Sequence, residues 1–159
     1  LRDMGAAMSP FNAFMFIQGL ETLALRMKEH TSNAEKVAEY LSNHDAVERV
    51  IYHSKMEGYA KERADKYLTR GNGGLMGFEI KGGIEAGKKF INALEMVYHV
   101  ANIGDARSLA IHPGSTTHSQ LNEEELLAAG ITPGFVRLSI GLEHIDDIIA
   151  DYEQALSKV

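Results

Sequence analysis

The fold of this chain is decided by the stretch SPFNAFMFIQGLETLALRMKEHTSNAEKVAEYLS, residues 9–42. Ser9 and Pro10 make a strong helix start, because a serine oxygen accepts from the unpaired first amides and proline fits the first helical position. Apolar residues then recur at mostly helical spacing. We predict one helix on the order of 50 Å long, at 1.5 Å per residue. A glycine inside a helix costs roughly 1 kcal/mol relative to alanine, so a bend at Gly19 or near Thr31 is compatible with the pattern.

Beyond this helix, short strands and helices alternate irregularly. Apolar runs and period-two alternation predict strands over residues 47–52, 75–80, 96–100, 107–111 and 135–140. Helical spacing predicts helices over residues 58–68, 84–94 and 144–156, and Asn122 caps a further helix with an acidic first turn. Since the connections mix short turns with helices, we expect an α/β chain of the two-layer α+β sandwich type. Its small, mainly antiparallel sheet would be covered by helices, with the long helix at the N-terminal side.

Length and composition are those of one ordinary globular domain. The 159 residues carry a net charge of −6 and no basic run, so nucleic acid is not an expected partner. Cysteine is absent, which excludes disulfides and cysteine nucleophiles and suits a cytoplasmic location. The apolar stretch 11–25 is too polar to span a bilayer. Residues 1–5 lack a charged region followed by an apolar core, so we do not expect them to be a signal peptide. Because the sequence begins at Leu1 and not at Met, we expect a fragment of a longer protein.

Arg137 is the most informative residue for function. It interrupts the apolar strand predicted over residues 135–140, and arginine is rarely fully buried without a partner. A guanidinium aimed into a cleft could bind a substrate carboxylate through two parallel hydrogen bonds. The alternative, which periodicity alone favours, is an outward-facing strand residue or a structural ion pair.

Three other groups of polar residues could take part in binding or catalysis. The turn over residues 102–105 could present backbone amides to an anion, although a plain bend between strands is commoner. His112 and His118 would need two further ligands from elsewhere to hold a metal ion, so we expect no metal site. Ser115, His118 and Asp105 could be combined as a nucleophilic triad, but no Gly-x-Ser-x-Gly sequence supports it.

Several long segments, in order along the chain, carry a family resemblance. They are Leu1-Arg2-Asp3-Met4-Gly5 with Ser9-Pro10-Phe11, then residues 19–27, 102–105, 108–109 with 112–113, 117–118 and 136–143. Together they resemble the C-terminal domain of the Cys/Met-metabolism family of pyridoxal-phosphate (PLP) enzymes, which have fold type I. Residues 1–159 would then form that small domain with the start of its long inter-domain helix. The PLP-binding domain would precede it and is absent here.

The finer sequence forms narrow the resemblance. Asn102-Ile103-Gly104-Asp105 and Ser115-Thr116-Thr117-His118 are similar to the O-acetylhomoserine sulfhydrylases of methionine biosynthesis. Methionine γ-lyase and cystathionine γ-synthase of the same family are the alternatives, and a non-catalytic binding or oligomerisation module is the second. The stretch 52–55 departs from relatives, which usually carry a Pro-Gly-Leu turn there.

The resemblance implies roles for three residues. Arg137 aligns with the arginine that binds the α-carboxylate of the amino-acid substrate, Asn102 with a position whose backbone lines the same pocket, and Thr117 with a threonine near it. The implied reaction of the full-length transferase is PLP-dependent γ-replacement, in which O-acetylhomoserine and sulfide give homocysteine and acetate.

The same resemblance places the PLP lysine in the missing domain. None of the nine lysines here has the Ser-x-x-Lys setting of the family. We therefore expect no catalytic residue, no bound PLP and no activity in this fragment alone. The full-length protein would be a homo-oligomer, a tetramer by analogy with the family.

Overall fold

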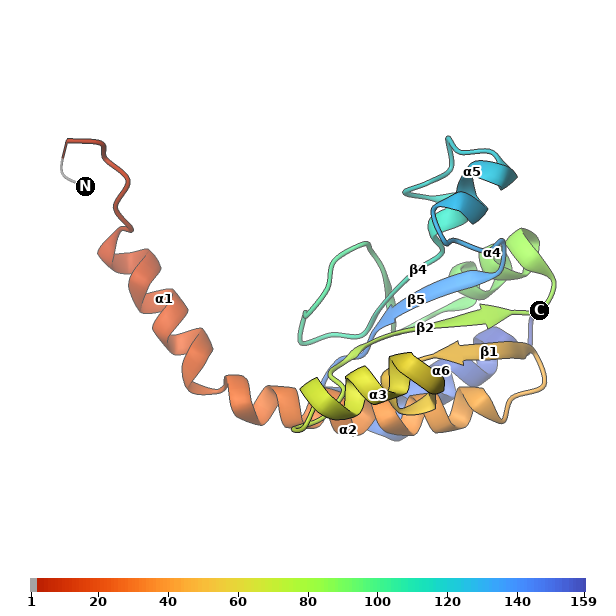
Figure 1. Cartoon of the computed structure of the whole chain (residues 1–159), viewed down its shortest axis with the longest axis horizontal. Coiled ribbons are helices and arrows are strands. Elements are labelled where there is room, and N and C mark those ends of the chain that lie inside the picture. Colours follow the sequence, from red (N-terminus) through yellow and green to blue (C-terminus); the bar gives the residue numbers. More distant parts are fainter. Residues whose placement is uncertain (1–2) are drawn as a thin grey trace.

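A computed structural model describes residues 3–159 (Figure 1). The helices are α1 (Pro10–Glu21), α2 (Leu23–Ser42), α3 (Gly58–Tyr67), α4 (Gly83–Ala93), α5 (Glu123–Ala128) and α6 (Ile145–Leu156), with short 3₁₀ helices η1 (His53–Lys55) and η2 (Pro113–Ser115). The strands are β1 (Val47–Ile51), β2 (Leu75–Ile80), β3 (Tyr98–His99), β4 (Leu109–Ile111) and β5 (Phe135–Ser139). Leu1 and Arg2, which begin the first segment of the resemblance, lie outside the described residues.

The predicted long helix is in fact two helices. Its start is confirmed, because Ser9 Oγ accepts a hydrogen bond from the Asn12 amide at 3.2 Å. The helix breaks at Thr22, where φ is −106° and ψ is 3°, three residues after the glycine that suggested a bend. Arg26 donates to the carbonyl of Gly19 at 2.5 Å across this break. Helix α2 then continues without a break past Thr31, the other position at which the sequence suggested a bend. Helix α1 leads away from the rest of the domain (Figure 1).

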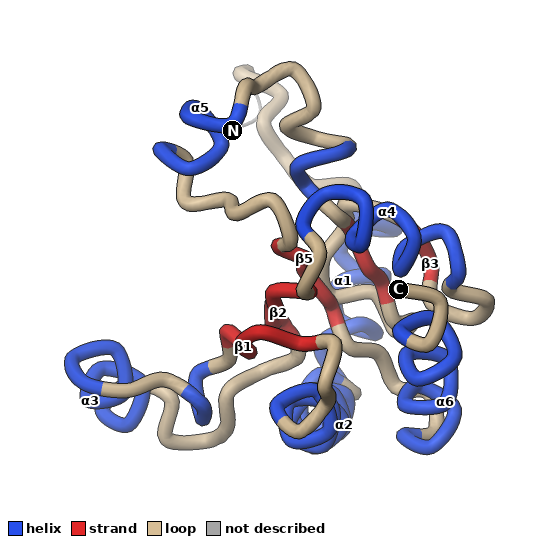
Figure 2. Tube along the Cα trace, turned by 90° about the vertical axis from the view of Figure 1, so that its right-hand side faces the viewer, coloured by secondary structure: helices blue, strands red, loops and turns tan. Residues whose placement is uncertain are grey.

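The sheet has five strands in the order β1-β2-β5-β4-β3. Every neighbouring pair is antiparallel except β3 with β4, which is parallel. Helices α2, α4 and α6 lie together on one side of the sheet (Figure 2). The predicted two-layer architecture with a mainly antiparallel sheet is therefore confirmed, and β5 lies at its centre.

The core forms between one face of the sheet and these three helices. Alternation along the strands points one set of side chains inward, so Leu138 pairs across the sheet with Met76 on β2 and with Ala110 on β4. Phe78 meets Phe90 of α4 edge to face, with ring centroids 5.4 Å apart. Burying each such large apolar side chain contributes roughly 1.5–3 kcal/mol. No helix within residues 3–159 is long and apolar enough to cross a membrane.

One buried carboxylate fastens α6 to the segment between α4 and β3. Asp151 is 6% exposed, and it accepts hydrogen bonds from the backbone amides of Glu95, Met96 and Val97 at 2.9, 3.0 and 2.9 Å. These amides have no strand or helix partner of their own, so the side chain satisfies donors that burial would otherwise leave unpaired.

Replacing this carboxylate should destabilise the fold. We expect Asp151→Ala to lower the free energy of unfolding by about 3 kcal/mol, because buried amides lose a charged acceptor. Asp147→Ala on the same helix is the control, since Asp147 is exposed and loses only a favourable position near the helix start, worth less than about 1 kcal/mol. Equilibrium denaturation measures both, and equal losses in the two variants would contradict the assigned role.

Candidate functional site

Strand β5 turns its polar side chains away from the core. Val136 and Leu138 are fully buried among the core residues, so Phe135, Arg137 and Ser139 occupy the opposite face of the sheet. This face is the one that α2, α4 and α6 leave uncovered (Figure 2). The candidate site is built on it.

The register of the sheet gives Arg137 its surroundings. It lies between Gly77 on β2 and Ile111 on β4. Glycine brings no side chain to the face at this position, and the ring of Phe135 lies over it, since an added Cβ would come within 2.5 Å of that ring. Ile111 is 4% exposed and lies outside the main core cluster. The arginine therefore stands on an apolar strip of the sheet.

The Arg137 guanidinium contacts the beginning of the turn over residues 101–105. Its Nη2 donates to the carbonyl oxygens of Ala101 at 2.7 Å and of Asn102 at 3.4 Å. The side chain is half-buried, and across residues 3–159 no carboxylate lies within ion-pair distance of it. The structural ion pair that was one alternative for Arg137 is therefore not formed within residues 3–159. Arg137 and Asn102 lie together, as the resemblance implied.

Hydrogen bonds join the turn to the end of β5, and the segment after the turn to Glu143. The Gly104 amide donates to Ser139 Oγ at 3.1 Å, and Gly104 has a φ of +81°, the left-handed region that favours glycine. Farther along, the amide and hydroxyl of Ser108 both donate to the Glu143 carboxylate, at 2.6 and 2.9 Å. Within the described chain the Asn102 N–H has no acceptor. The turn therefore offers a free backbone donor next to a cation.

Thr117 makes its hydrogen bond on the loop after η2 and not with Arg137. It is exposed on the loop after η2, and its Oγ1 shares a hydrogen bond with His118 Nδ1 at 2.9 Å. No hydrogen bond in residues 3–159 joins it to Arg137 or to the turn.

His112, which was weighed as a metal ligand, is a buried structural residue. It is 0% exposed, and its ring nitrogens pair with Ser115 Oγ and with the Pro133 carbonyl, both at 2.8 Å. Burial lowers the pKa of His112, and the Pro133 carbonyl opposes that shift in part. Gly87 makes room for the ring, since a Cβ there would lie 2.4 Å from it. The imidazole thus connects the end of β4 to the loop before β5.

The other chemical readings of this cluster are not supported. Ser115 pairs with His112 and not with His118, while Asp105 accepts from the Arg107 amide at 3.0 Å. The triad weighed from the sequence is therefore not assembled. A search of the described residues finds no group of three His, Asp or Glu side chains that could hold a metal ion.

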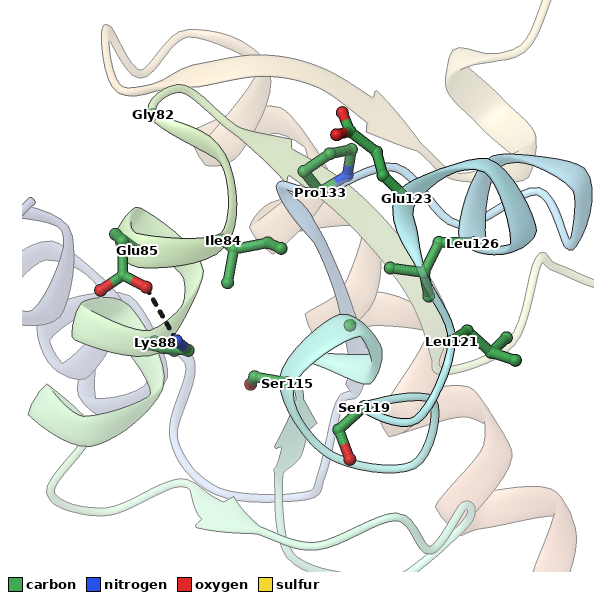
Figure 3. Close-up of a pocket in the computed structure, with 11 residues that line it drawn as sticks. Gly82, Ile84, Glu85, Lys88, Ser115, Ser119, Leu121, Glu123, Leu126 and Pro133 are labelled. Atoms are coloured by element: carbon green, nitrogen blue, oxygen red, sulfur yellow. Dashed lines mark hydrogen bonds and ion pairs between the residues drawn. The ribbon is translucent and has the colours of Figure 1, made fainter.

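Two of the cavities in the described residues differ in their relation to the turn. A cavity of about 510 Å³ lies between α4, η2 and α5, where Lys88 pairs with Glu85 at 2.7 Å (Figure 3). It contains none of the three predicted site residues. A second cavity, of about 400 Å³, is mostly apolar and is bordered by Leu23, Met27, Ile103, Gly104 and Ser139. This second cavity adjoins the turn.

Comparison with known proteins assigns the family. The profile of the Cys/Met metabolism PLP-dependent enzymes matches residues 1–157. The chain belongs to this family of pyridoxal-phosphate enzymes, as the resemblance indicated.

Individual relatives agree with the family. The chain is 56% identical to an O-acetyl-L-homoserine sulfhydrylase of Leptospira meyeri, over 100% of this chain and 36% of that protein. It is 44% identical to an L-methionine gamma-lyase of Pseudomonas putida, over 98% and 39% of the two chains. A crystal structure from Campylobacter jejuni, provisionally assigned as an O-acetylhomoserine (thiol)-lyase and holding N'-pyridoxyl-lysine-5'-monophosphate, superposes with a TM-score of 0.86. That structure shares 46% identity and covers 98% of this chain and 37% of its own. The chain thus spans little more than a third of the length of these relatives.

The lysines of this chain lie mostly at its surface. Eight of the nine are exposed, and the half-buried Lys61 pairs with Asp65 in α3. A lysine that forms an imine is usually desolvated or lies beside another cation, so that its pKa falls. None of the nine hydrogen-bonds to Arg137 or to the turn within residues 3–159. That the cofactor lysine lies outside this chain stays a prediction.

Proposed function

We propose that this chain is the substrate-carboxylate-binding C-terminal domain of an O-acetylhomoserine sulfhydrylase. The observation that carries the proposal is the Arg137 guanidinium, which is half-buried, lacks a carboxylate partner in residues 3–159, and lies against the turn that exposes the Asn102 N–H. An anion placed there would satisfy both donors. The amino-acid substrate brings such an anion in its α-carboxylate.

The chemistry of this chain would be binding and orientation. A two-pronged arginine–carboxylate contact is worth roughly 1.5–3 kcal/mol and fixes the direction of the carboxylate. Fixing the carboxylate sets which bond at Cα aligns with the cofactor. Pyridoxal phosphate, when bound, supplies the electron sink for proton removal and γ-replacement. Thr117 is proposed as a third contact at the edge of the same pocket, on the resemblance alone.

The sulfhydrylase is favoured over the other activities of the family by sequence similarity. The identity is 56% to the Leptospira meyeri sulfhydrylase and 44% to the Pseudomonas putida gamma-lyase. The forms Asn102-Ile103-Gly104-Asp105 and Thr116-Thr117-His118 point the same way. Methionine γ-lyase and cystathionine γ-synthase are the alternative activities.

A second body of protein is expected beside α1. This helix has no buried residue, and it exposes apolar side chains on every side, including Phe11, Phe14, Phe16, Ile17 and Leu20. A helix that is apolar all round is typical of a buried one. We propose that the upstream PLP-binding domain covers it in the full-length protein. By analogy with the family, we also propose that the full-length protein is a cytoplasmic homo-oligomer.

Removing the guanidinium should weaken the grip on the amino acid. In the full-length enzyme we expect Arg137→Ala to lower kcat/KM for O-acetylhomoserine by more than tenfold, or about 1.4 kcal/mol of transition-state stabilisation. Arg63→Ala is the matched control, because Arg63 is exposed on α3 and its guanidinium lies over the Tyr59 ring, 5.5 Å from the ring centroid. A loss smaller than tenfold in the Arg137 variant would refute the assignment.

The acceptor thiol is tested by a separate assay. We expect the full-length protein to form homocysteine from O-acetylhomoserine and sulfide. With cysteine as acceptor, or with methionine as sole substrate, turnover should be far slower. Faster formation of cystathionine would favour the synthase, and rapid release of methanethiol would favour the γ-lyase, without changing the proposed role of Arg137.

The isolated chain should be silent. Because its lysines are solvent-accessible or paired, we expect residues 1–159 mixed with pyridoxal phosphate to show no turnover. The cofactor spectrum should change no more than it does with an unrelated protein bearing as many surface lysines. Measurable formation of homocysteine by this chain alone would show the expectation to be wrong.

A further inference from the structure

We infer that Ser139 is a positioning residue for the carboxylate site, because its hydroxyl holds the turn of residues 101–104 beside the Arg137 guanidinium. The inference rests on the proposed function and adds a residue to it. Ser139 lies two positions after Arg137 on β5, so both side chains project from the same face of the sheet.

The two side chains hold the turn with opposite polarity. Arg137 donates to the carbonyl oxygens of Ala101 and Asn102, whereas Ser139 accepts from the amide of Gly104. In the described part of the chain, no other hydrogen bond ties residues 101–104 to the rest of the domain. The later anchors begin at Ala106, whose carbonyl accepts from the Leu142 amide at 2.8 Å, and at Ser108, which donates to Glu143. The position of the turn therefore depends on two residues of one strand, Arg137 and Ser139.

Only one of these two tethers is independent of the substrate. Arg137 would share its N–H groups between the turn and a bound carboxylate, so its hold on the turn would change as the ligand arrives. The Ser139 hydroxyl faces a backbone amide that no ligand needs. It can keep the Asn102 N–H in place while the guanidinium reorients.

The local backbone makes such a tether necessary. Gly104 has a φ of +81°, and an added Cβ would meet nothing within 4 Å, so its surroundings do not restrain it by contact. Glycine populates positive and negative φ with similar ease, and a turn built on it has alternative shapes. Ser139 is 4% exposed and pairs in the sheet with both Leu75 and Leu109. A hydroxyl on such a rigid support selects one shape of the turn.

The test uses the full-length enzyme and three variants. Ser139→Ala removes the acceptor, Ser139→Thr retains it, and Ser115→Ala removes a hydroxyl that pairs with buried His112 instead. We expect Ser139→Ala to raise KM for O-acetylhomoserine and the inhibition constant of L-norleucine by about three- to tenfold, the size of one lost neutral hydrogen bond. The kcat value should stay within about twofold of the parent value, because the lost hydrogen bond involves none of the reacting atoms. The inhibition constant of n-pentylamine should also stay within about twofold, because this amine lacks the carboxylate that the turn would bind.

Backbone exchange supplies a readout that does not depend on catalysis. Hydrogen–deuterium exchange over residues 101–104 should accelerate in Ser139→Ala and return to the parent rate in Ser139→Thr. Ser115→Ala should lower thermal stability but leave both the exchange of the turn and the norleucine-to-pentylamine ratio unchanged. Unchanged exchange in Ser139→Ala, or equal weakening of norleucine and pentylamine, would overturn the positioning role.

Arg137→Ala, measured in parallel, separates the two levels of the argument. If it weakens norleucine and Ser139→Ala does not, the carboxylate site stands and only the role of Ser139 is lost. If Arg137→Ala leaves norleucine binding unchanged, the proposed function fails, and the role of Ser139 at that site fails with it.

Discussion

The contact between the Arg137 guanidinium and the carbonyl oxygens of residues 101 and 102 is the interaction on which the site depends. It exists because β5 alternates strictly, with Val136 and Leu138 committed to the core. Slipping the strand by one residue would bury the charged side chain among Phe78, Phe90 and their neighbours, at a cost that an unpaired buried charge makes prohibitive. The apolar residues of the strand thus determine the direction of its one cation.

Local patterns predicted the secondary structure well, because each element is specified by neighbouring residues. The Asn122 cap is an example: it accepts from Glu125 while the Glu125 side chain bonds back to the Asn122 amide, which is a complete capping box. The predicted position of the break between α1 and α2 was wrong, because the sequence signal available was the low helix propensity of Gly19, whereas the helix breaks at Thr22. The Arg26 side chain, which joins the two helices across the break, becomes visible only in three dimensions.

The hydrogen-bond partners of the buried polar residues could not be predicted from the sequence. The partners of Asp151 lie 54 to 56 residues away along the chain, and His112 meets a carbonyl 21 residues away. No periodicity encodes such pairs. The partners of Arg137 are equally distant, at 35 and 36 residues, and they were anticipated only through resemblance. Ser139 did leave a signal, since a second polar residue two positions after Arg137 interrupts the same apolar strand.

The proposed role also limits what this chain can specify. Every amino-acid substrate of the family carries an α-carboxylate, so a site that grips the carboxylate serves a sulfhydrylase and a γ-lyase equally. This agrees with identities of 56% and 44% to relatives that bear those two names. The choice between sulfide addition and elimination must then be made where the side chain of the substrate lies. Among the residues described here, the exposed side chain of Ile103 in the turn and the apolar cavity beside it lie next to the carboxylate site. Discrimination between the activities therefore falls either to that turn or to the domain that carries the cofactor.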